Sequence, residues 1–141
     1  MGRTLRVRTD GRLPAYAHEG DAGLDLRAAC LCEIPPHSSE LVPTGLQVEI
    51  PTGCMGLMAP RSGLGSSGIT MRNAVGIIDS GFRGELKVPL WNTTDEPFLV
   101  SPGYRIAQLV ILPFVPCSVE RADELSDSER GADGYGSTGV R

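Results

Sequence analysis

The stretch IAQLVILPF, residues 106–114, is nearly continuous apolar sequence, interrupted at Gln108 and ended near Pro113. A strand of this composition has no face suited to water, so it is expected to be covered on both sides. The segment therefore predicts a strand in the interior of a sandwich or at a subunit interface, and the residues alone leave both alternatives open.

Shorter strands are predicted on the N-terminal side of this segment. Residues 47–50 alternate polar and apolar side chains, as a half-buried strand does. Residues 86–91 alternate in part, and Pro89 within them indicates an edge strand or a bulge, because proline cannot donate to a neighbouring strand. Regularly spaced turn signals complete a pattern that predicts an all-β sandwich or barrel; they lie at residues 35–36, 51–53, 63–65, 81, 92–96 and 101–103.

Composition excludes several other architectures. The 141 residues suffice for one domain, and the 18 Gly and 11 Pro are scattered, so the longest stretch free of both is residues 117–130. Proline breaks helices and glycine weakens them, which excludes a helical bundle or coiled coil and leaves only residues 119–129 as a possible short helix. The apolar content of 40% excludes an unfolded chain. We predict one β-barrel domain over residues 1–129 and a mobile polar tail over residues 130–141.

Charge and targeting signals narrow the range of partners. The net charge of −4 argues against nucleic acid as a partner. No apolar run is long enough to span a membrane, and the N-terminus lacks the apolar core of a secretion signal, so we expect a cytoplasmic location and no membrane partner. The four Cys and two His do not have zinc-ligand spacing. The cysteines are interpreted as small buried apolar residues in a reducing compartment.

Two polar segments contain groups suited to anions or metal ions. Residues 21–26, DAGLDL, place two carboxylates around a glycine at the start of a predicted strand, although Asp beside Gly is also usual in turns. Residues 60–65, PRSGLG, offer a guanidinium, a hydroxyl and flexible backbone amides that can surround phosphate oxygens. This segment lacks the lysine and the spacing of a Walker loop, so a plain glycine-rich turn is the competing interpretation.

A third segment, NAVGIIDSGFRGEL at residues 73–86, reads as two strands around a turn at Ser80 and Gly81. This pattern predicts a hairpin with Asp79 and Phe82 beside its tip. An acid next to an aromatic ring can orient a water against the flat face of a ligand, and an acid that merely caps the turn is the alternative.

Two more features lie near the C-terminus. Gln108 is an amide within an otherwise apolar strand, and a buried amide needs a hydrogen-bond partner. Residues 130–139, RGADGYGSTG, combine an arginine, an aromatic ring and two hydroxyls. Such an end is typical of a disordered tail, or of an arm that becomes ordered over a phosphorylated aromatic ligand.

In this order, the five segments resemble the five motifs of the trimeric all-β dUTPases, the deoxyuridine triphosphate nucleotidohydrolases, over residues 21–139. The resemblance implies a jelly-roll-like subunit that forms a homotrimer with a swapped C-terminal arm. Each active site would then be built from three chains, with residues 130–141 closing over the site of another subunit. The implied reaction converts dUTP to dUMP and pyrophosphate with Mg²⁺ on the triphosphate, which keeps uracil out of DNA and supplies dUMP for thymidylate synthesis.

The resemblance also implies roles in catalysis. Asp79 matches the acid that orients and deprotonates the water attacking the α-phosphorus. Asp25 matches the carboxylate that contacts the metal through its water shell, and Gln108 matches the amide near the α-phosphate and the attacking water. Positioning and charge neutralisation are most of what phosphoryl transfer requires. The β- and γ-phosphates are implied to bind the loop of a neighbouring chain that contains Arg61, Ser62 and Gly63.

Substrate selection is implied to lie in residues 73–87. Asn73, with backbone groups near Gly76 and Lys87, matches the group that hydrogen-bonds the uracil edge. The ring of Phe82 would lie under the deoxyribose and exclude a 2′-hydroxyl. A site built on buried hydrogen bonds can reject a mismatched analogue by about 10⁴-fold or more. In the arm, the implied contacts are those of Arg130 with the γ-phosphate, Tyr135 with uracil, and Ser137 and Thr138 with the phosphates.

Three residues depart from the family pattern. Phe82 stands where tyrosine is usual, and because the ring is kept we expect sugar selectivity to persist. Tyr135 stands where phenylalanine is usual, and either ring can stack. Asp133 replaces a usual glycine, which adds negative charge near a triphosphate and a Cβ where a positive φ is expected. Closure of the arm is therefore the property that these departures put in question.

Two other functions compete with this interpretation. A dCTP deaminase shares the fold and carries a glutamate as general base in the hairpin region. Here the turn reads DSGF at residues 79–82, and Glu85 follows only in the outgoing strand. A non-catalytic trimer that binds dUTP or a protein partner is the second alternative, and loss of Asp79 or of the tail would have favoured it.

Overall fold

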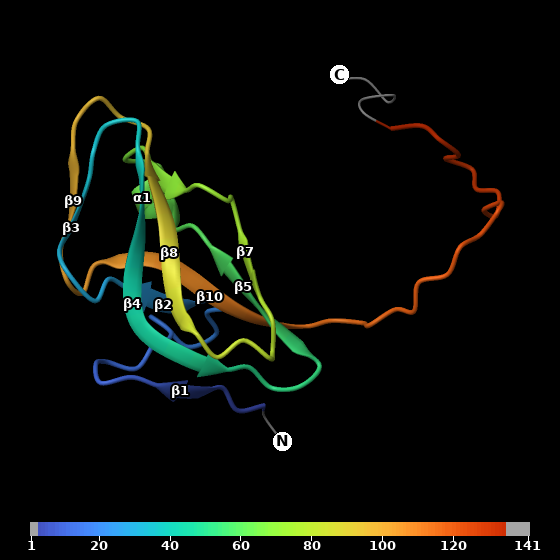
Figure 1. The fold of residues 1–141 in the computed structure, drawn as a ribbon, viewed down its shortest axis with the longest axis horizontal. Helices are drawn as coiled ribbons and strands as arrows, with labels where there is room; N and C mark the ends of the chain where they lie inside the picture. Colours follow the sequence, from blue (N-terminus) through green and yellow to red (C-terminus); the bar gives the residue numbers. More distant parts are fainter. Residues whose placement is uncertain (1–2, 135–141) are drawn as a thin grey trace.

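The structure is a computed structural model that describes residues 3–134. Within these residues the chain forms ten strands and one short helix, so the prediction of an all-β fold is confirmed (Figure 1). The elements are β1 (Arg6–Arg8), β2 (Leu24–Arg27), β3 (Cys32–Ile34), β4 (Ser39–Glu49), β5 (Cys54–Ala59), α1 (Ser62–Gly65), β6 (Ile69–Met71), β7 (Gly76–Ile78), β8 (Glu85–Asn92), β9 (Phe98–Val100) and β10 (Arg105–Pro113).

The strands form two four-stranded sheets and one two-stranded sheet. The first sheet has the order β1-β4-β8-β6, the second β2-β10-β5-β7, and β3 pairs with β9. Alternating side chains of both large sheets point into one apolar core, as in β8, where Leu86, Val88 and Leu90 are almost fully buried. The core therefore lies between the sheets, and each sheet keeps an outward face.

Strand β10 contains the apolar stretch and lies between β2 and β5. Its inward residues Ile106 and Leu109 are buried in the core, which confirms an interior position for this half of the strand. The outward residues are less covered, and Leu112 is exposed. The expectation that both faces are covered therefore holds in this chain only for the first half of the strand.

Pro89 is not at a sheet edge, because β8 lies between β4 and β6. The carbonyl of Pro89 accepts a hydrogen bond from the amide of Arg72, the residue that follows β6. In an antiparallel strand the N–H and C=O of one residue face the same neighbour. The missing N–H of Pro89 therefore faces the chain just beyond the short strand β6, where the ladder has ended. The edge prediction was wrong for this reason.

The hairpin predicted over residues 73–86 is also corrected. The turn exists, since the amide of Phe82 donates to the carbonyl of Asp79 at 3.1 Å. The strands on either side of it do not pair with each other: β7 pairs with β5, and β8 pairs with β4 and β6. The turn therefore connects the two large sheets. The strand before it, β7, belongs to the second sheet, and the strand after it, β8, belongs to the first.

The chain beyond β10 forms no helix or strand within residues 114–134. Figure 1 shows this segment leaving the sandwich beside the start of β5 and running away from it. The short helix expected over residues 119–129 is absent; Val119 in that segment is 96% exposed, so no apolar face of such a helix would be buried here. The predicted boundary at residue 129 stays a prediction. No helix in the described part of the chain has the length and apolar character that crossing a bilayer requires.

The cysteines are free thiols in different surroundings. Cys54 is buried, as interpreted from the sequence, whereas Cys30 and Cys117 are exposed and Cys32 is partly buried. The interpretation as buried apolar residues was thus wrong for the two exposed thiols, because they lie in irregular segments outside the core. Burial raises the pKa of the Cys32 thiol, and the neighbouring Glu40 and Cys30 raise it further.

Asn92 connects three segments from inside the protein. Its side chain is fully buried, and Nδ2 donates to the carbonyls of Ile34 at 3.1 Å and Glu96 at 2.7 Å. Its Oδ1 accepts from the amide and hydroxyl of Thr94 at 3.0 and 2.8 Å. A buried amide with all of these partners fixes the turn predicted at residues 92–96 against β3.

We predict that Asn92→Ala lowers the free energy of unfolding by roughly 3 kcal/mol or more, because buried carbonyls and an amide lose their partner. Urea unfolding at one fixed protein concentration measures this change. Gln47→Ala is the control, because Gln47 is half-buried and makes one solvent-exposed hydrogen bond, to the carbonyl of Arg83, so its loss should cost less than about 1 kcal/mol. Equal losses for the two variants would contradict the role given to Asn92.

Candidate active site

The outward face of the second sheet carries a row of polar and small residues. Gln108 on β10 lies directly opposite Asp25 on β2 and opposite Ala59 on β5. Leu24, Leu26 and Leu109 point into the core. Because side chains alternate along a strand, Asp25 between the first two leucines and Gln108 next to Leu109 point outward. The sheet register therefore brings Asp25 and Gln108 together, although they are 83 positions apart in the sequence.

Asp25 is the electrostatic centre of this row. Its Oδ1 lies 3.1 Å from Nε of Arg61, and its Oδ2 lies 3.5 Å from Nη1 of Arg105. The Asp25 side chain is 10% exposed, and a buried carboxylate of this kind is stable only when it is paired. Two guanidinium groups around one carboxylate leave a net positive charge, which suits an anionic ligand.

Gln108 connects the row to the loop that precedes α1. Its Nε2 donates to the carbonyl of Pro60 at 3.1 Å. Pro60 follows β5 directly, and Arg61, Ser62 and Gly63 continue from it into the single turn of α1, where the amide of Gly65 donates to the carbonyl of Arg61. The loop is thus attached both through its backbone, to Gln108, and through its arginine, to Asp25.

A cavity of about 440 Å³ lies next to Asp25. Its lining includes three arginines and a histidine, namely Arg12, Arg27, Arg105 and His18. Within residues 3–134, no three His, Cys, Asp or Glu side chains come close enough to hold a metal ion between them. The surroundings of Asp25 are therefore cationic rather than those of an acidic metal cage.

A second group of predicted site residues lies around β7. The amide of Val75 donates to the carbonyl of Asn73 at 2.6 Å, and Ala74 between them has a φ of 58°, in the left-handed region. This tight turn directs the Asn73 side chain back toward Gly76, where a Cβ would lie 3.6 Å from Nδ2 of Asn73. The amide of the preceding residue, Arg72, donates to the carbonyl of Pro89. Asn73 therefore lies beside the part of β8 that contains the exposed Lys87.

The turn after β7 is stabilised by a side chain of the turn itself. The Arg83 guanidinium donates to the carbonyls of Ser80 at 2.7 Å and Phe82 at 2.9 Å. The ring of Phe82 covers Gly84, since a Cβ built there would lie 2.6 Å from its Cζ atom. Phe82 is 43% exposed, and its amide bonds the carbonyl of Asp79 across the turn.

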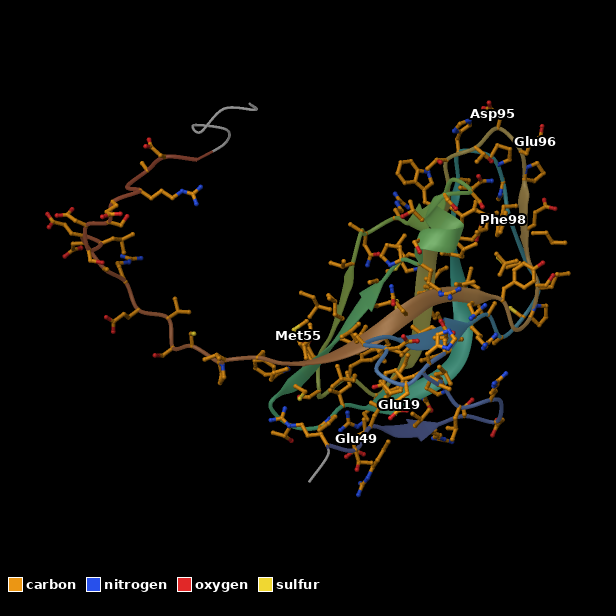
Figure 2. All side chains as sticks on the ribbon, turned by 180° about the vertical axis from the view of Figure 1, so that it is seen from behind. Glu19, Glu49, Met55, Asp95, Glu96 and Phe98 are labelled. Carbon is orange, nitrogen blue, oxygen red and sulfur yellow. The ribbon has the colours of Figure 1, made fainter. Side chains whose placement is uncertain are left out.

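One chain does not bring these two groups together. Ile78 lies opposite Gly56, so Asp79 follows beside Met55, at the beginning of β5, whereas Gln108 lies opposite Ala59 at its end. Figure 2 labels Met55 at the edge of the body from which the tail leaves. Two strand spacings and four residues along the strand separate Asp79 from Gln108, which is roughly 16 Å. One water molecule cannot contact both side chains within a single chain.

The arm residues fall partly outside the described residues. Tyr135, Ser137 and Thr138 lie beyond residue 134, so their predicted contacts are not described. Nε of Arg130 donates to the carbonyl of Asp133 at 2.8 Å. The strain expected at Asp133 is absent, because the positive φ of this turn, 53°, falls on Gly131. The added negative charge of Asp133 remains.

Sequence analysis missed three residues of this region. Arg105 pairs with Asp25, Arg83 holds the turn at residues 80–82, and Gly84 lies under the Phe82 ring. Arg83 and Gly84 lie within residues 73–86 and make local contacts inside its turn. The pairing of Arg105 with Asp25 joins positions that only the fold brings together. A signal existed only for Arg105, whose charge directly precedes the apolar stretch.

The dUTPase family model matches residues 9–139 of this chain. The chain is 48% identical to the deoxyuridine 5'-triphosphate nucleotidohydrolase of Hahella chejuensis, with 96% of this chain and 92% of that protein covered. It is 52% identical to the protein of the same name from Neisseria meningitidis serogroup C, with 97% of this chain and 94% of that protein covered.

Solved structures agree with these sequence relatives. A variant dUTPase of Staphylococcus bacteriophage 80alpha with dUpNHpp superposes with a TM-score of 0.90 at 30% identity, covering 97% of this chain and 99% of that chain. A variant dUTPase of phage phi11 of S. aureus, described with a structural Mg(II) ion, has a TM-score of 0.79 at 26% identity, covering 86% and 97%. With its register, its polar row and these matches over nearly the whole chain, the protein belongs to the dUTPase family.

Proposed function

We propose that this dUTPase cleaves dUTP between the α- and β-phosphates, with a loop around Arg61 binding the outer phosphates and Asp79 activating water. The observation that carries the proposal is the pairing of Arg61 with Asp25, next to Gln108, on a cationic outward face. The ion pair uses Nε of Arg61, which leaves the two terminal nitrogens of the same guanidinium for phosphate oxygens. The phage 80alpha relative carries the nucleotide dUpNHpp, which supports a triphosphate at this type of site.

In the proposed reaction the oxygen of a water molecule forms a bond to the α-phosphorus. The bond from that phosphorus to the oxygen bridging the α- and β-phosphates breaks, and pyrophosphate leaves. The Asp79 carboxylate takes the proton of the attacking water, and Gln108 orients the water and the α-phosphate. Such a reaction depends on positioning and charge neutralisation more than on covalent chemistry. The arginines that surround Asp25 in the polar row are suited to this task.

A homotrimer with shared sites is part of the proposal. Asp79 and Gln108 of one chain lie roughly 16 Å apart. A water molecule can therefore contact both residues only when they come from different chains. The outward face between them is apolar, because Val110, Leu57 and Ile77 lie in one cross-strand row. Ile77 is 66% exposed, so this face supports contact with another subunit.

The tail supports the proposed exchange of arms between subunits. In Figure 1 it runs away from its own body, and within it Val115 and Leu125 are 84% and 88% exposed. Exposed apolar side chains in an extended segment are typical of a segment that is covered by a partner chain. In the proposed complex Arg130 binds the γ-phosphate, Tyr135 stacks on uracil, and Ser137 and Thr138 cover the phosphates.

The residues fit a magnesium ion that is bound mainly by the triphosphate. Both oxygens of Asp25 contact arginines, so Asp25 would reach the ion through water rather than directly. Mg²⁺ retains several water ligands and combines them with phosphate oxygens, and it supplies charge neutralisation when bound. The structural Mg(II) ion of the phage phi11 relative supports a metal in this family without fixing its place here.

Selection of the base and sugar is proposed to follow the geometry around β7. The tight turn at Ala74 presents Asn73 and the backbone near Gly76 and Lys87 to the uracil edge. The Phe82 ring, lying on Gly84, would occupy the space of a 2′-hydroxyl under the sugar. The product dUMP would then supply thymidylate synthesis in the cytoplasm while dUTP is kept from entering DNA.

Deamination of dCTP is not favoured by the position of Glu85. Its Oε1 accepts a hydrogen bond from the amide of Gly45 at 2.9 Å, inside the irregular part of the β4–β8 pairing. A carboxylate used to satisfy the backbone of β4 in this way is not placed to activate water at a pyrimidine ring.

We predict that Asp79→Asn lowers the rate of pyrophosphate release from dUTP by about 10²- to 10⁴-fold, because the amide cannot accept the proton. Release from dUTP, UTP, dTTP and dCTP with Mg²⁺ is measured in parallel, and we expect it from dUTP alone. Asp95→Asn is the matched control, since Asp95 is exposed at the distant tip labelled in Figure 2 and pairs with His37. A fully active Asp79→Asn protein would refute the role of Asp79.

Measuring ammonia release and dUTP binding alongside pyrophosphate separates the alternative functions. Ammonia release from dCTP would establish the deaminase. Binding of dUTP without release of pyrophosphate from any nucleotide would establish the non-catalytic binder and implicate the charge of Asp133.

We predict that Phe82→Ala reduces the preference for dUTP over UTP, measured as the ratio of kcat/KM, by about tenfold or more, because the ring no longer blocks the 2′-hydroxyl. Phe114→Ala is the matched control, since both rings are 43% exposed. An unchanged ratio in Phe82→Ala, with both variants folded, would show that another group excludes the ribose.

A further inference from the structure

We propose that Gly23 is a positioning residue for Gln108: the absence of a side chain at Gly23 determines where the Gln108 amide lies. The inference rests on the proposed function of Gln108 and deepens it. Gly23 belongs to the segment with two carboxylates, residues 21–26, and has no role of its own in the proposed mechanism.

A side chain at Gly23 would overlap the Gln108 side chain on the neighbouring strand. A Cβ at Gly23 would lie 2.4 Å from Oε1 of Gln108 and 3.2 Å from its Cβ and Cδ atoms. Gln108 lies opposite Asp25, so Gly23 is its diagonal neighbour on the same outward face. The Gln108 side chain therefore bends over the bare backbone of Gly23, and its amide oxygen occupies the place of the missing methyl group.

The other side of the amide is fixed by a hydrogen bond. Nε2 of Gln108 donates to the carbonyl of Pro60 at 3.1 Å, and only the NH₂ end of an amide can donate. This bond sets which end of the amide faces the loop and leaves Oε1 on the side of Gly23. The side chain is thus confined between a carbonyl that attracts it and a glycine that gives it room.

These contacts close a ring that includes the phosphate-binding loop. Pro60 precedes Arg61, the Arg61 guanidinium pairs with Asp25 at 3.1 Å, and Asp25 lies opposite Gln108. A methyl group at Gly23 would push Oε1 away, because 2.4 Å is far below any contact distance between a carbon and an oxygen. The amide would then leave its bond to Pro60, and both the water-orienting group and the anchor of the loop would be displaced.

The test is Gly23→Ala, measured as dUTP hydrolysis by the full chain. A displacement of about 1 Å in a positioned group costs about 10²-fold in rate, so we expect kcat to fall by about 10²-fold and KM to change much less. Gly11→Ala is the matched control, because a Cβ there meets only Oγ1 of Thr9, at 3.6 Å, and its kcat should equal that of the wild type.

A double-mutant cycle with Gln108→Ala distinguishes positioning from general damage to β2. If Gly23 acts through Gln108, adding Gly23→Ala to Gln108→Ala costs little further, because the amide is already gone and only the Cβ at position 108, 3.2 Å away, has to shift slightly. Should Gly23→Ala alone fail to fold, folding of the double variant would support the same contact. Wild-type kcat in Gly23→Ala, or a full additional loss in the double variant, would overturn the proposal.

A readout without turnover keeps the two proposals separate. In ¹⁵N-labelled protein the side-chain amide signals of Gln108, identified by their loss in Gln108→Ala, should shift in Gly23→Ala and stay in place in Gly11→Ala. If the wild type released no pyrophosphate from dUTP, the proposed function would fail while these signals still decided the position of Gln108. Unshifted Gln108 signals in Gly23→Ala would refute the positioning role.

Discussion

The register of β10 between β2 and β5 is the constraint on which the candidate site depends. It is fixed from both sides, because Gln108 lies opposite Asp25 on one neighbour and opposite Ala59 on the other. A shift by one residue would exchange the two faces of the strand, moving Gln108 into the core and the fully buried Leu109 out of it. The apolar core therefore determines where the polar row lies, even though none of its side chains takes part in the chemistry.

Electrostatic balance around Asp25 follows from this placement. A carboxylate with a 10% exposed side chain is costly to bury, and the arginines on its two oxygens compensate for that cost. The contact with Asp25 also holds Arg61 of the loop against the polar row, so one interaction both stabilises the buried charge and positions a cation. Because each group of this kind depends on the others, the loop, the strand and the ion pair are expected to respond together when any of them changes.

Much of this arrangement could be predicted from the sequence, and the failures have specific physical reasons. The apolar stretch around Leu109 predicted a strand in a sandwich interior or at a subunit interface, and the pattern of turns predicted the all-β class. Pro89 was interpreted as a sign of an edge strand or a bulge, because the sequence does not reveal that β6 ends where the missing N–H lies. The turn after Asp79 was recognised, but local sequence cannot tell which sheet each flanking strand joins. Contacts such as that of Gly23 with Gln108 depend on distances between strands, which no local pattern contains.

The separation of Asp79 from the row around Gln108 has a genetic consequence under the proposed assembly. If each site takes Asp79 from one subunit and Gln108 from another, a chain defective in one of them still contributes an intact half to a neighbour's site. Two inactive alleles, one altered at Asp79 and one at Gln108, could then complement each other in mixed trimers, because some sites would combine the two undamaged halves. A chain altered at only one of these residues would disable one of the three sites of its trimer, so the activity lost in a heterozygous cell would match the share of defective chains and not exceed it.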